Sequence, residues 1–278
     1  MSFTWSPEEA PVAAPLGVAG SARASLRGLV LLVVVLSGLM LLLLIRLFER
    51  PLYGLRRPMS PVITVCVCRI ALRVLRLRHE VMGQPMPHAG AVVANHASWL
   101  DIFVLNAAKR IYFVSKAEVA GWPGIGALAR ATGTVFIARD RAQAKAQTAL
   151  FEARLTAGHK LLFFPEGTST DGMRVLPFKT TLFQAFFSPE LHDSLHIQPV
   201  TVIYTAPRDA DARFYGWWGD MEFGGHFLKV LAARGPGAVT VIYHAPVAVR
   251  DWGSRKALAA HLEAQVRAGM PPDRRASA

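Results

Sequence analysis

The sequence predicts an α/β domain with a mostly buried β-sheet, preceded by a membrane-anchoring segment. From residue 81 onward, short apolar runs alternate with helical stretches, which is the pattern of an α/β fold. Upstream lies a run of 18 residues without a charge, Gly28 to Ile45. Hydrophobic residues make up 52% of the 278 residues, and the mean hydropathy is +0.30. Both values are high for a purely soluble protein and indicate contact with a membrane.

The N-terminal region predicts a tail and then a membrane span. Residues 1–20 carry Pro, Ala and Gly without a period, so we expect a disordered tail there. A helix over Gly28–Ile45 would be roughly 27 Å long, close to the thickness of the hydrocarbon core. A cleaved signal peptide is disfavoured, because the run starts late and the charged segment 46–50 follows it. A buried core helix is the alternative, since the run is at the short end of the spanning range.

The charges beside this run predict its orientation. Two arginines precede the run and four follow it within residues 46–57. The positive-inside tendency then places the C-terminal bulk of the chain in the cytoplasm. We therefore expect a protein of the cell inner membrane whose C-terminal domain lies on the cytoplasmic side.

Residues 61–78 predict a helix that lies in the membrane interface. Arg69, Arg73 and Arg76 recur on one helical face, and apolar residues cover much of the rest. An amphipathic helix packed on the domain is the alternative. A second full span is less favoured, because an arginine at mid-membrane costs about 2.5–3.5 kcal/mol on insertion scales.

The following domain is predicted from its apolar runs. We expect strands over Ala91–Ala94, Ile111–Val114, Thr134–Ile137, Leu161–Phe164, Ile197–Ile203 and Val239–Tyr243. Residues 142–157 are Ala-rich and end at Gly158, as a helix would. The expected organisation is a disordered tail over 1–20, membrane-anchoring helices over 21–80, a catalytic domain over 81–250, and a C-terminal helix and disordered tail over 251–278.

Charge and motif content exclude several function classes. The formal net charge of +12 attracts anionic surfaces, and the first 80 residues carry half of the excess. A nucleic-acid role is disfavoured because no helix-turn-helix, RNA-binding or zinc-finger signature accompanies the charge. No Gly-x-Ser-x-Gly elbow of a serine hydrolase occurs. Cys66 and Cys68 support neither a disulfide framework nor a zinc site.

Three short segments carry the candidate chemistry. The first is 95–101, where His96 and Asp101 form the kind of pair that makes a general base near neutral pH. Five positions on an ideal helix would leave the two side chains about 140° apart. We therefore expect His96 in a strand-to-helix turn and Asp101 in the first turn of the helix, where N–H groups can bind an anion.

The other two segments follow strand-like runs. Arg139 stands at the exit of the run 134–138, and arginine suits bidentate recognition of phosphate or carboxylate. Glu166, Gly167 and Thr168 form a turn after Pro165, in which glycine permits close approach of a ligand to the backbone. Taken alone, Arg139 would more often be a solvated charge at a strand end, and residues 166–168 would more often be an ordinary turn.

Together these segments resemble the glycerolipid acyltransferase family, typified by 1-acylglycerol-3-phosphate acyltransferase. The four blocks of the family occur in order. They are Asn95-His96-x-Ser98-x-x-Asp101, then Lys116-x-Glu118 with Pro123, Gly126 and Gly133-x-x-Phe136-Ile137-x-Arg139, then Phe164-Pro165-Glu166-Gly167-Thr168, and a looser Gln198-Pro199-Val200.

The resemblance implies a mixed sheet flanked by helices and the transfer of an acyl group. It implies that His96 is the base for the acceptor hydroxyl and that Asp101 orients it. The implied substrate-binding residues are Asn95, Ser98, Lys116, Arg139, Glu166, Gly167 and Thr168. The implied partners are membrane lipids and an acyl thioester of acyl carrier protein or coenzyme A as co-substrate, with no cofactor, metal or nucleic acid.

Our main expectation is acylation of 1-acylglycerol-3-phosphate to phosphatidate. An alternative acceptor is lyso-ornithine lipid, because Ser169 stands where the family commonly has Arg, and a zwitterionic acceptor needs fewer cations than a phosphate. The stretches 172–179 and 215–221 also look more like the bacterial subgroup that contains lyso-ornithine lipid acyltransferases. An alternative of another class is a scaffold that binds anionic lipid without catalysis, for which His96 would be dispensable.

Overall fold

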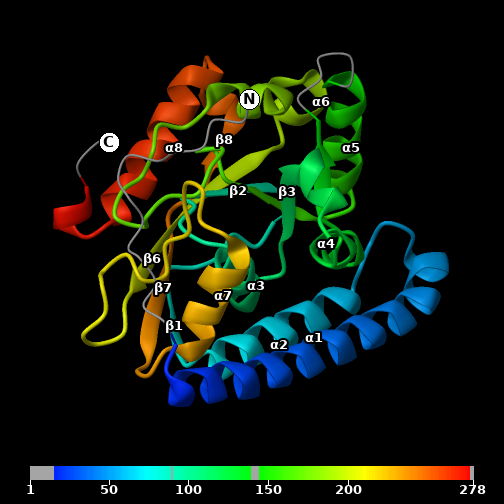
Figure 1. Cartoon of the computed structure of the whole chain (residues 1–278). Helices are drawn as coiled ribbons and strands as arrows, with labels where there is room; N and C mark the ends of the chain where they lie inside the picture. The colour runs from blue at the N-terminus through cyan, green and yellow to red at the C-terminus, as the bar shows by residue number, and fades with distance from the viewer. Residues whose placement is uncertain (1–15, 89, 139–143, 276–278) are drawn as a thin grey trace.

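The structure is a computed structural model that describes residues 16–88, 90–138 and 144–275 (Figure 1). The main helices are α1 (Val18–Tyr53), α2 (Ser60–Val74), α3 (Asp101–Ala108), α4 (Ile125–Thr132), α5 (Ala144–Thr156), α6 (Pro189–His192), α7 (Phe223–Ala232) and α8 (Arg255–Gly269). The strands are β1 (Leu77–Met82), β2 (Gly90–Ala94), β3 (Tyr112–Lys116), β4 (Val135–Ile137), β5 (Lys160–Phe163), β6 (His196–Thr205), β7 (Gly237–Tyr243) and β8 (Val247–Ala248).

The strands form one mixed sheet in the order β1-β7-β6-β2-β5-β3-β4, with β8 paired to β6. The strands β6, β2, β5, β3 and β4 run parallel to one another. β7 and β8 are antiparallel to β6, and β1 is parallel to β7. This confirms the predicted α/β fold with a mixed central sheet. The six predicted strands are all present.

Helices cover both faces of the sheet, as Figure 1 shows. Along β2, Val92 and Ala94 point into one hydrophobic core, while Ala91 and Val93 point into the other. The first core includes side chains of α2, α3 and α7, and the second includes side chains of α5 and α8. Because both faces are buried, the central strands read as continuous apolar runs in the sequence.

α1 and α2 lie side by side along one side of the domain, at the bottom of Figure 1. α1 also packs against α7. A Cβ atom on Gly38 would overlap the side chain of Val67, so the glycine lets the two helices approach closely. Among the described residues, α1 is the one helix long and apolar enough to cross a membrane.

Hydrogen bonds fasten α1 to the domain near both of its ends. Arg23 donates to the carbonyl of Ala232, and Arg27 donates to those of Leu231 and Ala233 at 2.8 and 2.9 Å. These carbonyls belong to the C-terminal end of α7, which favours a cation. Near the other end of α1, Arg46 donates to the carbonyl of Ala131 in α4.

The structure differs from the expected helix over residues 61–78. α2 ends at Val74, Arg76 adopts a positive φ of 55°, and β1 begins at Leu77. The sheet therefore starts before residue 81, within the segment expected to be membrane-anchoring. Arg69 and Arg73 lie on α2, but Arg76 does not.

The chain ends also differ from the expected tails. α1 begins at Val18, and residues 1–15 lie outside the described part of the chain. After α8, Met270 is completely buried, and a short 3-10 helix follows at Pro272–Arg274. The segment 270–275 is therefore packed on the domain, although a disordered tail was expected there.

Candidate active site

The candidate site lies where β2 ends and α3 begins. β2 ends at Ala94, α3 starts at Asp101, and His96 lies in the connection between them. This is the strand-to-helix turn expected from the sequence. It places His96 at the carboxyl edge of the parallel strands, where ligands bind in open α/β sheets.

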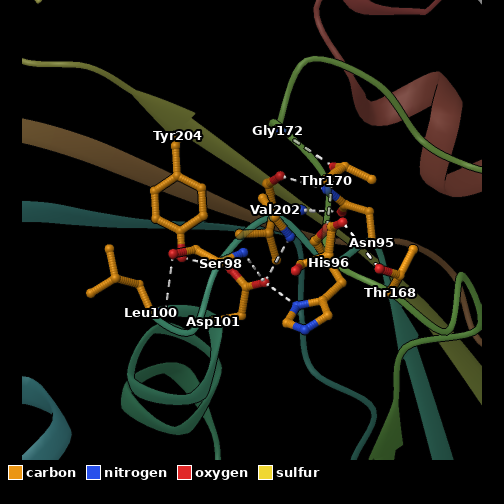
Figure 2. Close-up of polar contacts among 12 residues, drawn as sticks. Asn95, His96, Ser98, Leu100, Asp101, Thr168, Thr170, Gly172, Val202 and Tyr204 are labelled. Atoms are coloured by element: carbon orange, nitrogen blue, oxygen red, sulfur yellow. Dashed lines mark hydrogen bonds and ion pairs between the residues drawn. The ribbon is translucent and has the colours of Figure 1, made fainter. Parts of the chain in front are cut away.

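His96 and Asp101 contact each other directly (Figure 2). Nδ1 of His96 is 2.7 Å from Oδ2 of Asp101, which confirms the predicted contact. The carboxylate is completely buried, and the His96 side chain is 21% exposed. The pair therefore has one buried partner and one that reaches the surface.

Both carboxylate oxygens of Asp101 accept further hydrogen bonds. Oδ2 also accepts hydrogen bonds from the backbone N–H groups of Ala97 and Ser98, at 2.9 and 3.0 Å. Oδ1 accepts from the hydroxyl of Tyr204 at 2.6 Å. Asp101 is also the first residue of α3, where the helix dipole favours a negative charge. These donors compensate the Asp101 carboxylate for its burial away from water.

The contact also orients the imidazole. A carboxylate that accepts from Nδ1 keeps the proton on that nitrogen and leaves Nε2 as the acceptor on the opposite side of the ring. The ring stacks on Phe164, with centroids 4.0 Å apart and planes 11° apart. His96 is therefore held in the tautomer and orientation of a general base that acts through Nε2.

Neighbouring segments fix the backbone of this loop. The carbonyl of His96 accepts from the N–H of Thr170 at 2.9 Å, and the N–H of Trp217 donates to the carbonyl of Ala97 at 2.8 Å. Trp99 Nε1 donates to Nδ1 of His226 at 2.9 Å. Burial lowers the pKa of His226 to about 3, so its imidazole stays neutral and able to accept. Three separate segments thus hold the loop that carries His96.

Two of the expected substrate-binding residues instead hold the fold together. The Asn95 amide donates to the carbonyl of Val202 and accepts from its N–H, at 2.9 and 2.8 Å. Ser98 is completely buried, and its hydroxyl accepts from the N–H of Leu100 at the start of α3. Both side chains are completely buried and bonded to backbone partners, so the geometry gives the predicted contact of Asn95 and Ser98 with substrate no support, and that contact stays a prediction.

Glu166 lies beneath the site rather than on its surface. The residue is 1% exposed, and neither carboxyl oxygen makes a hydrogen bond of normal geometry within the described part of the chain. Burial raises the pKa of Glu166 well above its ordinary value, and the nearby Asp101 adds to the shift. The backbone N–H groups of His96 and Leu176 oppose it only in part. Glu166 therefore lies beneath the His96 loop in surroundings that favour its protonated form.

The other predicted residues are placed as follows. Gly167 has a φ of +71°, and a Cβ atom there would lie 2.6 Å from Nζ of Lys179, so the turn requires glycine. Thr168 is half-buried beside it. Lys116 ends β3, two strands from β2 in the sheet. Arg139 lies outside the described residues.

The sequence did not reveal Tyr204 or Thr170 as members of the site. Each is brought to the His96 loop only by the fold, from 103 and 74 residues away. Tyr204 belongs to β6, which pairs with β2, so the position of the tyrosine depends on the strand order. Thr170 lies two residues beyond the predicted turn at 166–168, and no motif in the sequence analysis includes Tyr204.

Comparisons with known proteins identify the family. A sequence model of the Acyltransferase family matches residues 78–203, which include His96, Asp101 and Glu166. The chain is 59% identical over 266 residues to a lyso-ornithine lipid O-acyltransferase of Rhodobacter capsulatus, covering 96% of each chain. It is 41% identical over 120 residues to a 1-acyl-sn-glycerol-3-phosphate acyltransferase of Neisseria gonorrhoeae, covering 41% of this chain and 46% of that protein.

A solved structure shares the fold. The 1-acyl-sn-glycerophosphate acyltransferase PlsC of Thermotoga maritima superposes with a TM-score of 0.56 at 21% identity, covering 87% of this chain and 95% of the other. At that identity the likeness concerns the fold alone. The 59% match, which runs over nearly the whole of both chains, establishes the relationship, and the chain therefore belongs to the acyltransferase family and is an acyltransferase.

Proposed function

We propose that this enzyme transfers a fatty acyl group from a thioester to the free hydroxyl of lyso-ornithine lipid. The observation that carries the proposal is the 59% identity to a lyso-ornithine lipid O-acyltransferase over 96% of both chains. Ser169, which stands where the family commonly has Arg, supports it, because a zwitterionic acceptor needs fewer cations than a phosphate. The proposed acceptor is thus the alternative from the sequence analysis, lyso-ornithine lipid, and it replaces our main expectation, 1-acylglycerol-3-phosphate.

The proposed mechanism uses the His96–Asp101 pair as it stands. Nε2 of His96 takes the proton of the acceptor hydroxyl while the hydroxyl oxygen attacks the thioester carbonyl carbon. The ester C–O bond forms, the thioester C–S bond breaks, and the departing sulfur takes the proton from the imidazolium. Asp101 keeps the ring in the reactive tautomer and stabilises the imidazolium between the two proton transfers.

Four further residues complete the proposed site. Gly167 and Thr168 lie in the turn that follows Phe164, whose ring packs on His96, and they are candidates to contact the acceptor. Arg139 and Lys116 are proposed to bind its anionic group. The donor is proposed to be an acyl carrier protein or coenzyme A thioester, and the location the cytoplasmic side of the inner membrane.

Acylation of 1-acylglycerol-3-phosphate is the second candidate. The observation that favours it is the 41% identity to a 1-acyl-sn-glycerol-3-phosphate acyltransferase over a segment of 120 residues. This match covers less than half of either chain, whereas the first match covers nearly all of both.

Acceptor competition tests the proposal. Membranes that contain the expressed protein receive a labelled acyl thioester with either lyso-ornithine lipid or 1-acylglycerol-3-phosphate, and membranes with the His96→Ala variant serve as the blank. We expect His96-dependent label in ornithine lipid at a kcat/KM at least about tenfold above that for phosphatidate formation. Faster formation of phosphatidate would reject the proposed acceptor, and label independent of His96 would reject the mechanism.

A further inference from the structure

A cavity lies at the opposite edge of the sheet from His96. It has a volume of about 840 Å³ and opens between the α1–α2 connection, the end of α3 and the starts of β3 and β5. β5 begins at Lys160, which lines the cavity, and Glu166 follows the far end of that strand. Six residues at about 3.3 Å each separate the two places by up to roughly 20 Å. The cavity is therefore distinct from the candidate active site.

The cavity is strongly cationic. Its lining includes six basic side chains, Arg56, Arg57, Arg69, Lys109, Arg110 and Lys160. No aspartate or glutamate is among the lining residues. Over the described ranges 16–88, 90–138 and 144–275, none of the six is within 4.0 Å of a carboxylate oxygen. The few hydrogen bonds that they donate go to backbone carbonyls, as from Arg69 to Ala107 and from Lys160 to Pro87.

The excess of positive charge contributes to lowered pKa values of two groups that line the cavity. Burial together with Arg154 and Arg57 lowers the pKa of His159 to about 4. Burial and the neighbouring Lys109 lower the pKa of Lys160. An anion that enters the cavity would relieve the repulsion among these cations.

The other half of the lining is apolar and continues onto the exposed surface of the two N-terminal helices. Tyr53 at the end of α1 and Val62, Val65 and Cys66 on α2 line the cavity. Leu52 and Leu55 beside it are 72% and 50% exposed. An apolar, solvent-exposed rim beside a cationic cavity matches a molecule with an anionic head and hydrocarbon chains.

We propose that this cavity binds the phosphate headgroup of an anionic phospholipid, whose acyl chains lie along the exposed apolar side chains of α1 and α2. The volume is within the range of small-molecule sites. Arginines bind phosphate oxygens through paired donors, and Arg56, Arg57, Arg69 and Arg110 supply four guanidinium groups. The site is independent of the acceptor that His96 serves, and its ligand is not a substrate.

Cys66 provides a readout that needs no mutation. Cys66 lines the cavity and is exposed, whereas Cys68 is buried and burial raises the pKa of its thiol to about 12. The full-length protein in detergent is reacted with a polar maleimide, with and without phosphatidylglycerol. We expect phosphatidylglycerol to slow the alkylation of Cys66 at least about fivefold and phosphatidylcholine to slow it less than twofold. Equal rates with and without phosphatidylglycerol would overturn the proposal.

Two further arms identify the source of the phosphate. Inorganic phosphate and deacylated glycerophosphoglycerol are tested in the same assay, and we expect each to need at least about tenfold higher concentration for equal protection. Protection by either at the concentration of the lipid would overturn the lipid assignment in favour of a free phosphate.

Two matched triple variants distinguish lipid binding in the cavity from non-specific attraction of lipid to the basic surface. The cavity variant is Arg56→Gln with Lys109→Gln and Arg110→Gln. Its control is Arg50→Gln with Arg73→Gln and Arg208→Gln, three exposed arginines outside the cavity lining. With folding verified by thermal unfolding, we expect the cavity variant to bind phosphatidylglycerol-containing vesicles at least about tenfold more weakly than the control variant does. Equal losses in the two variants would show non-specific attraction and overturn the site.

Discussion

The hydroxyl of Tyr204 donates a 2.6 Å hydrogen bond to Oδ1 of Asp101, the carboxylate whose other oxygen holds His96. Tyr204 is completely enclosed on β6, and burial together with Asp101 raises its pKa well above the ordinary value. The phenol therefore stays protonated and acts as a donor throughout the working pH range. The hydrogen bond makes Tyr204 the third member of a Tyr–Asp–His chain, in which the tyrosine positions the carboxylate.

Tyr204→Phe is expected to lower kcat about tenfold with little change in KM, since the loss of a hydrogen bond to a charged group costs about 1.5–3 kcal/mol. An Asp101 carboxylate that lacks this donor is held less firmly and positions the imidazole less well, so kcat/KM should be lower across its pH profile. Tyr215→Phe is the control, because the buried Tyr215 ring packs near Tyr204 while its hydroxyl has no hydrogen-bond partner within the described residues. Identical profiles for the two variants would exclude the positioning role.

Removal of the dyad should abolish turnover while the fold survives. His96→Ala removes the base, and Asp101→Asn favours the wrong tautomer, so we expect kcat to fall by about 10²–10⁴ in each. His192→Ala serves as control, because Nδ1 of His192 also contacts an aspartate, Asp193 at 3.0 Å, but on the surface. Initial rates with saturating thioester measure the effect. Near-wild-type rates in either dyad variant would refute the mechanism.

Asn95→Ala should act on stability rather than on substrate binding. Asn95 pairs with both backbone groups of Val202, just beyond the point where β2 stops pairing with β6. Two buried backbone groups would lose their partner, and we expect the free energy of unfolding to fall by about 2–4 kcal/mol. Denaturant unfolding measures the change. A stable variant with a raised KM for the acceptor would instead restore a role in substrate binding.

Glu166→Gln should flatten the pH dependence of stability. The pKa of Glu166 is raised from 4.5 in the folded protein, so the folded state binds this proton more tightly than the unfolded state. The stabilisation is complete below about pH 4.5 and is lost as pH rises towards the folded-state pKa. Glutamine keeps the shape without the ionisation, so the variant should lose less stability than the wild type between pH 5 and pH 8. Thermal unfolding at each pH measures the effect. If the Tm of the variant and that of the wild type changed in parallel with pH, Glu166 would be ionised in the folded protein.

Arg27→Ala should loosen α1 from the domain. Its guanidinium donates to two carbonyls at the end of α7, and contacts of this kind contribute about 1–2 kcal/mol. We expect faster cleavage of α1 by a protease in detergent and a lower Tm. Arg50→Ala, also on α1 but exposed, is the matched control. Equal cleavage of the two variants would mean that Arg27 does not hold the helix.

The sequence predicted what depends on local pattern and missed what depends on partners far along the chain. The central strands were predictable because both of their faces are buried. β1 was not, because Arg78, His79 and Glu80 make this edge strand polar, and the arginine row at 69–76 resembled a longer helix. The geometry of His96 and Asp101 followed from a spacing of five. The role of Tyr204 depends on which strand lies beside β2, and the strand order of a sheet cannot be predicted from a short segment of sequence.

The packed C-terminal segment has a practical consequence for engineering. Arg274 donates to the backbone carbonyl of Tyr204 at 3.0 Å, and Met270 is wholly enclosed. A truncation after Gly269 would therefore open a void beside α8 and free the strand that carries the phenol. Shortened versions, or fusions that replace residues 270–275, would therefore lose stability as core substitutions do. They would also lose activity, because Tyr204 would be less well positioned.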